Sequence, residues 1–63
     1  MGIKTKVFKW AKKIGHKEAK DRLMAAGLKY SATTKLITGN YGPEPKAEMT
    51  IMINEAMEME VHD

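Results

Sequence analysis

Hydrogen-bonding side chains gather in one short segment of the chain, residues 27–43, which reads GLKYSATTKLITGNYGP. Hydroxyl groups of serine, threonine and tyrosine lie there among lysines, with few apolar residues between them. A hydroxyl can both donate and accept a hydrogen bond, and a lysine ammonium donates three. Such side chains either face solvent or bind a polar partner, so this segment is the candidate functional site.

The other reactive residue types form no catalytic constellation. The chain has no cysteine to act as a nucleophile, no carboxylates paired as if to share a pocket, and no GxxxxGK segment that could cradle a phosphate. The two histidines, His16 and His62, have no cluster of metal ligands near them in the sequence. We therefore expect a protein that is not an enzyme and that uses no metal, cofactor or small-molecule substrate.

The elements that position this segment must be few, because 63 residues form one domain at most. A chain of this length buries only about 60% of the surface of its unfolded form, and no disulfide can stabilise it. No apolar run approaches the ~18 residues of a membrane span or forms a signal-peptide core. We expect a single domain over residues 1–63, located in the cytoplasm and not associated with a membrane.

Charge divides the chain into two unlike halves. Residues 1–36 hold ten Lys and Arg against two carboxylates, a net charge of +8. Residues 37–63 hold one Lys against six carboxylates, a net charge of −5. Such asymmetry is typical of proteins in which one half meets a polyanion, either nucleic acid or anionic lipid.

Apolar periodicity predicts helices over residues 3–14, 17–26 and 30–38. In the first, apolar residues recur at i, i+4, i+7, i+8 and i+11, and lysines fill the opposite face. In the second, Glu18 and Arg22 are spaced i, i+4, which favours a local ion pair. Glycines follow these segments at the positions where a helix would end, namely Gly15, Gly27 and Gly39.

The C-terminal segment, residues 46–61, supports two interpretations. As a helix, its methionines, Ile53 and Ala56 cover one broad face, with Ile51 on the opposite side. As a β-hairpin, MTIMI and MEMEVH alternate around a turn at residues 54–56. This turn lacks a glycine, so we favour the helix and an all-α domain of about four helices. A methionine-lined, acidic helix would suit a dimer interface.

Two helices joined by a short glycine turn, with a polar second helix, are typical of a helix-turn-helix. In that motif the first helix packs across the DNA backbone, and the second enters the major groove and presents side chains to base edges. The turn needs a glycine because the chain reverses too tightly for most residues that carry a Cβ.

The segment AAGLKYSATTKLITGNYGP resembles the Cro/C1-type helix-turn-helix family of phage and plasmid repressors. The spacing from Gly27 through Leu28 to Gly39 matches the family, and YSATTKLI is similar to its recognition helix in a Ser-Ala pair, a lysine and an isoleucine. Thr33 stands where the family usually has Val or Ile in the core, so we expect Thr33 to be buried. The resemblance implies a homodimeric transcription regulator, a repressor, whose partner is double-stranded DNA.

Position by position, the resemblance also implies roles for individual residues. The candidate readers of base edges are Tyr30, Ser31, Thr34 and Lys35. The candidate phosphate contacts are Lys29, Asn40 and Tyr41 beside the recognition helix and Lys17 near the start of the preceding helix. Tyr41 could instead anchor the loop that follows.

Two other functions fit parts of the sequence. The chain could be a protein-interaction module that uses the methionine-rich C-terminal face. Alternatively, residues 2–17, with a lysine face and the single Trp10, could lie on an anionic membrane surface.

Overall fold

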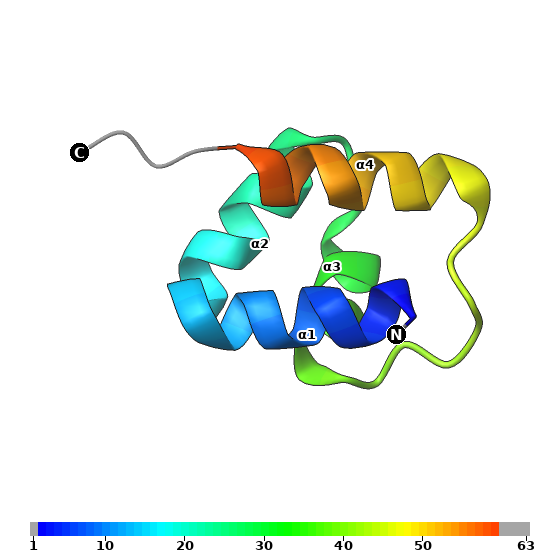
Figure 1. Ribbon diagram of the computed structural model, residues 1–63, viewed down its shortest axis with the longest axis horizontal. Helices are drawn as coiled ribbons and strands as arrows, with labels where there is room; N and C mark the ends of the chain where they lie inside the picture. Colours follow the sequence, from blue (N-terminus) through cyan, green and yellow to red (C-terminus); the bar gives the residue numbers. More distant parts are fainter. Residues whose placement is uncertain (1, 60–63) are drawn as a thin grey trace.

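The computed structural model describes residues 2–59 as a small domain of four helices (Figure 1). The helices are α1 (Ile3–Ile14), α2 (His16–Ala25), α3 (Tyr30–Thr38) and α4 (Ala47–Glu58). Residues 2–59 contain no strand, so the predicted all-α class is confirmed and the hairpin alternative is wrong. The last two residues of the predicted fourth helix, and His62, lie outside the described residues.

The observed helix bounds follow the predicted ones closely. The bounds of α1 and α3 are those predicted, whereas α2 begins and ends one residue earlier than expected. The shift arises because the first turn of α2 forms directly on Gly15, whose carbonyl accepts a hydrogen bond from the Ala19 N–H at 2.9 Å. No helix within residues 2–59 is long and apolar enough to cross a membrane.

One apolar core lies between the helices. Its buried hydrophobic members are Val7, Ala11, Ala19, Leu23, Leu28, Leu36, Ile37, Ile53 and Ala56. Burying a valine, leucine or isoleucine side chain contributes about 1.5–3 kcal/mol, and six of these nine residues are of that kind. Every helix supplies at least one member, so the helices hold one another in place.

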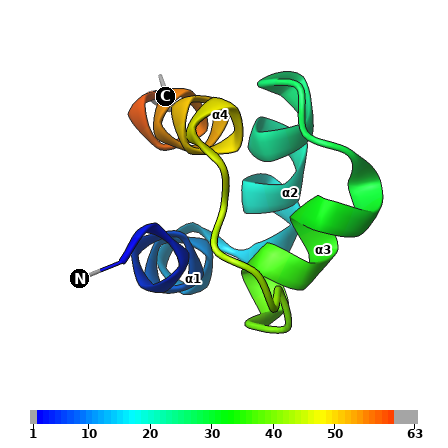
Figure 2. The same ribbon diagram turned by 90° about the vertical axis from the view of Figure 1, so that its right-hand side faces the viewer.

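The packing leaves one side of α3 uncovered. Helices α1 and α4 run side by side in the same direction, and α3 lies on the other side of the molecule (Figures 1 and 2). Helix α2 packs on each of the other three helices, whereas α3 packs on α1 and α2 but not on α4. The outer face of α3 therefore points away from the α1–α4 pair.

Two cations of the basic half fasten distant parts of the chain. The Lys4 ammonium donates to the carbonyls of Tyr41 at 3.3 Å and Gly42 at 3.1 Å, which ties the connector before α4 to α1. The Arg22 guanidinium donates to the Met59 carbonyl, just beyond α4, at 2.7 Å. Arg22 also pairs with Glu18 at 3.4 Å, so the predicted local ion pair is confirmed.

Candidate nucleic-acid interface

A tight turn at Gly27 sets α3 against α2. The Gly27 N–H donates to the Met24 carbonyl at 3.0 Å and the Leu28 N–H to the Leu23 carbonyl at 3.1 Å, the paired bonds of a Schellman motif. Gly27 has a φ of +116°, and a Cβ added there would lie 3.4 Å from the Met52 sulfur. Backbone conformation and close packing therefore both favour glycine, as the sequence predicted. Leu28 is buried and fixes the chain where it leaves the turn.

Helix α3 has one buried face and one polar face. The buried face consists of Thr33, Leu36 and Ile37. Ser31, Lys35 and Thr38 are exposed and are spaced i, i+4 and i+7, so they share the opposite face. The predicted burial of Thr33 is confirmed, with no part of the residue exposed. Because the core holds the buried face, the rotation of α3 about its axis is fixed, and the hydroxyl and ammonium groups of the opposite face point outward.

Two of the candidate readers have surroundings that the sequence did not reveal. Thr34 is half-buried, and its hydroxyl oxygen is buried with no hydrogen-bond partner. Tyr30 is 58% exposed, and the Lys20 ammonium lies 4.8 Å from the centre of its ring. Ser31 and Lys35 thus present their polar groups directly, whereas the Thr34 hydroxyl does not.

The C-terminal end of α3 carries a further polar group, Thr38, that the sequence interpretation missed. Its hydroxyl donates to the Thr34 carbonyl at 2.8 Å and accepts from the Asn40 side-chain amide at 3.2 Å. Gly39 ends the helix with a φ of +81°, and the Asn40 N–H donates to the Lys35 carbonyl at 2.8 Å. The spacing of seven residues from Ser31 is the signal that places Thr38 on the polar face of α3.

The predicted flanking residues lie on both sides of α3. Lys29 directly precedes the helix and is exposed, as is Asn40 after it. Lys17 is exposed in the first turn of α2. Tyr41 is half-buried, packs against the core and accepts the Lys4 hydrogen bond through its carbonyl, which is how a loop anchor behaves.

The surface around α2 and α3 is electropositive. Residues 16–40 carry five Lys and Arg against two carboxylates, a net charge of +3. Glu18, one of the carboxylates, already pairs with Arg22. Lys17, Lys29 and Lys35 are exposed, which suits contact with a polyanion.

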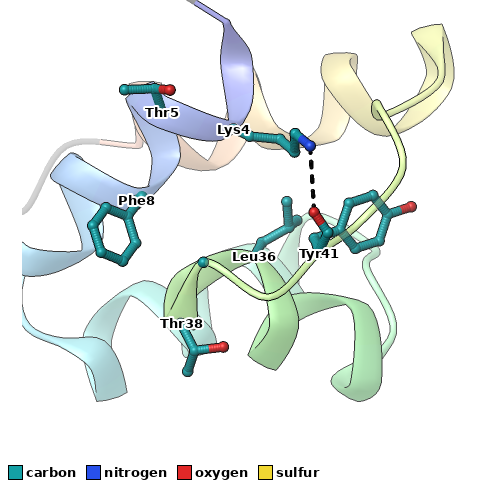
Figure 3. A pocket seen from close by; sticks show the side chains of 7 residues that line it. Lys4, Thr5, Phe8, Leu36, Thr38 and Tyr41 are labelled. Atoms are coloured by element: carbon teal, nitrogen blue, oxygen red, sulfur yellow. Dashed lines mark hydrogen bonds between the residues drawn. The ribbon is translucent and has the colours of Figure 1, made fainter.

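A groove of about 400 Å³ separates the end of α3 from α1 (Figure 3). Phe8 forms one wall, and the Lys4 side chain closes the groove toward Tyr41. Leu36 points into the groove, whereas Thr38 points away from α1. Thr38 also lines the groove, so the groove adjoins the polar face of α3 at the C-terminal end of the helix.

Residues 2–59 contain no group of three or more histidine and acidic side chains that could hold a metal ion. Comparison of the chain with protein-family models, curated proteins and solved structures gave no match.

Proposed function

We propose that this chain is a sequence-specific DNA-binding transcriptional regulator, a repressor of the Cro/C1 helix-turn-helix type that places α3 in the major groove. The observation that supports the proposal best is the unit formed by α2, the Gly27 turn and α3. A nine-residue helix is held by its buried face and turns Ser31, Lys35 and Thr38 outward. The major groove, about 12 Å wide, admits such a helix.

Each outward group has a chemical role in this proposal. Lys35 can donate to the O6 and N7 atoms of guanine, and Ser31 can donate to or accept from a base edge. Thr38 offers an oxygen that Asn40 already contacts. Lys17, Lys29 and Asn40 contact phosphates, which fix orientation but do not read sequence.

A second copy of the chain completes the proposal. One short helix reads few base pairs, whereas a homodimer reads two half-sites spaced about one helical turn apart. Ile51 supports a dimer interface on α4, since it is 58% exposed on the face opposite the core. We place the protein in the cytoplasm of a cell that hosts a phage or plasmid.

Selection of bound sequences from random duplex DNA tests the proposal. We expect the selected duplexes to share a short palindromic sequence. Lys35→Gln should bind the selected duplex more weakly than the wild type by about 1–3 kcal/mol, because one base contact is removed. Lys6→Gln is the matched control, since Lys6 is an exposed lysine of α1 that is assigned neither to a base edge nor to a phosphate. Selection without any sequence preference, or equal losses in both variants, would contradict sequence reading by α3.

A protein-interaction module is the second candidate function, and exposed Ile51 is the observation that favours it. Deleting α4 is a poor test because Ile53 and Ala56 belong to the core. Ile51→Lys leaves the core intact and should abolish both self-association and partner capture, measured by sedimentation and pull-down. A variant that still self-associates and still captures partners would exclude this face.

Membrane-surface binding by residues 2–17 is the third candidate and has the least support. Trp10 is half-buried and packs against the core, so its ring is not free to enter a bilayer interface while the domain stays folded.

A further inference from the structure

Two lysines are held over aromatic rings at the two ends of α3. At the start of the helix, the ammonium of Lys20 from α2 lies 4.8 Å from the centre of the Tyr30 ring. On α1, the ammonium of Lys12 lies 4.8 Å from the centre of the Phe8 ring. Phe8 rests against the residue that ends α3, since a Cβ at Gly39 would lie 3.4 Å from its Cε1 atom.

We propose that Lys12 and Lys20 are a pair of phosphate clamps that grip the DNA backbone at the two ends of the reading helix. This inference rests on the proposed function and extends the contact surface to α1, which the helix-turn-helix pattern does not include. Helix α3 has nine residues and is therefore about 14 Å long, slightly more than the ~12 Å width of the major groove. With α3 in the groove, cations beside its two ends would come within reach of the phosphate backbone.

The aromatic rings make these lysines better clamps than free surface lysines. The negative face of an aromatic ring attracts an ammonium group without using its N–H donors. Part of the rotamer entropy of the long side chain is therefore lost before DNA binds, and less remains to be lost on binding. Lys12 is exposed and Lys20 is half-buried.

Other cations of the basic half have different tasks. Lys4 donates to connector carbonyls, and Arg22 donates to the Met59 carbonyl. Lys6 is exposed but lies six residues from Lys12, about 120° away around the axis of α1. Lys6 is thus a matched control, because it is an exposed lysine on the same helix as Lys12.

The test is binding to a fluorescein-labelled random-sequence duplex of about two helical turns, titrated at salt concentrations from about 50 to 200 mM. We expect Lys12→Gln and Lys20→Gln each to reduce the salt slope by about 0.9 and to weaken binding about eightfold at 0.1 M salt, because each removes one phosphate contact. Lys6→Gln should leave the slope unchanged.

A double-mutant cycle tests whether the Phe8 ring acts on DNA binding through Lys12. Phe8→Leu should weaken binding in the wild-type background but add nothing to Lys12→Gln, because the ring acts through the lysine. Thermal melting of each variant verifies that it is folded.

The possible failures are distinguishable. Wild-type protein that binds no duplex, or binds without salt dependence, overturns the proposed function together with the clamps. Wild-type protein that binds with a salt slope, while Lys12→Gln and Lys20→Gln match Lys6→Gln, overturns the clamps alone. Additive losses for Phe8→Leu and Lys12→Gln would show that Phe8 does not act through Lys12.

Discussion

The buried hydroxyl of Thr33 should make the wild-type domain less stable than its Thr33→Val variant. Thr33 is fully buried, and its oxygen has no hydrogen-bond partner within the described part of the chain. Burying an unpaired hydroxyl costs about 1–3 kcal/mol, and valine replaces that oxygen with a methyl group of similar size. Valine and threonine have similar helix propensities, so the backbone contributes little to the difference.

We expect Thr33→Val to raise the free energy of unfolding by about 1–2 kcal/mol. In a domain of this size, each 1 kcal/mol raises the melting temperature by about 4–8 °C, so the variant should melt about 4–16 °C higher. Thermal unfolding followed by circular dichroism measures the shift, and urea titration gives the free energy independently.

Two variants test the reasoning behind this expectation. Thr33→Ser keeps the hydroxyl and deletes a buried methyl group, so it should lose about 1 kcal/mol or more. Thr5→Val makes the same chemical change at an exposed position and should stay within about 0.5 kcal/mol of wild type. A Thr33→Val variant that melts at or below the wild-type temperature would refute the idea that the hydroxyl is unpaired.

Three further predictions concern the parts that hold α3 and α4. Arg22→Met should lower the free energy of unfolding by about 1–3 kcal/mol, because the charged donor to the Met59 carbonyl is lost. It should also speed amide exchange in the last turn of α4, and unchanged exchange there would contradict this role of Arg22. Gly27→Ala should lower the free energy of unfolding, measured by urea titration, by about 1–3 kcal/mol, because Gly27 has a φ of +116°. Gly42→Ala, with open space around it, should lower it far less. Equal losses would show that the turn imposes no strain. Trp10 fluorescence should not shift on addition of anionic vesicles, since its ring packs against the core; a blue shift would favour membrane binding.

Local patterns in the sequence were enough to predict most of the fold. Apolar periodicity and a glycine at the helix end are both features of residues within one or two helical turns of each other. They were therefore enough to predict the bounds of α1 and α3. The preference for a helix at residues 46–61 depended on the missing turn glycine, and the structure confirms it over Ala47–Glu58. Ile51 likewise lies where the helical arrangement placed it, on the outer side of α4.

The parts that sequence reasoning missed depend on contacts between distant residues. Lys4 and Arg22 were counted with the basic half, yet each donates to carbonyls 37 or 38 positions away in the chain. The Thr34 hydroxyl was expected to face outward, but packing leaves its oxygen buried. Thr38 is the last residue of α3, and the sequence did not predict it as a reader although it shares the outer face with Ser31 and Lys35.

The use of Lys4 and Arg22 inside the fold has a measurable consequence for the salt dependence of DNA binding. The lysines assigned to phosphates on the proposed DNA face are Lys12, Lys17, Lys20 and Lys29. If each neutralises one phosphate, a single copy gives a salt slope of about −3.6, and a homodimer on adjacent half-sites gives about −7. The slope therefore reports stoichiometry. A value near −7 that falls to half in Ile51→Lys would place the dimer contact on α4, whereas a slope shallower than about −2 would be incompatible with the basic face proposed for this domain.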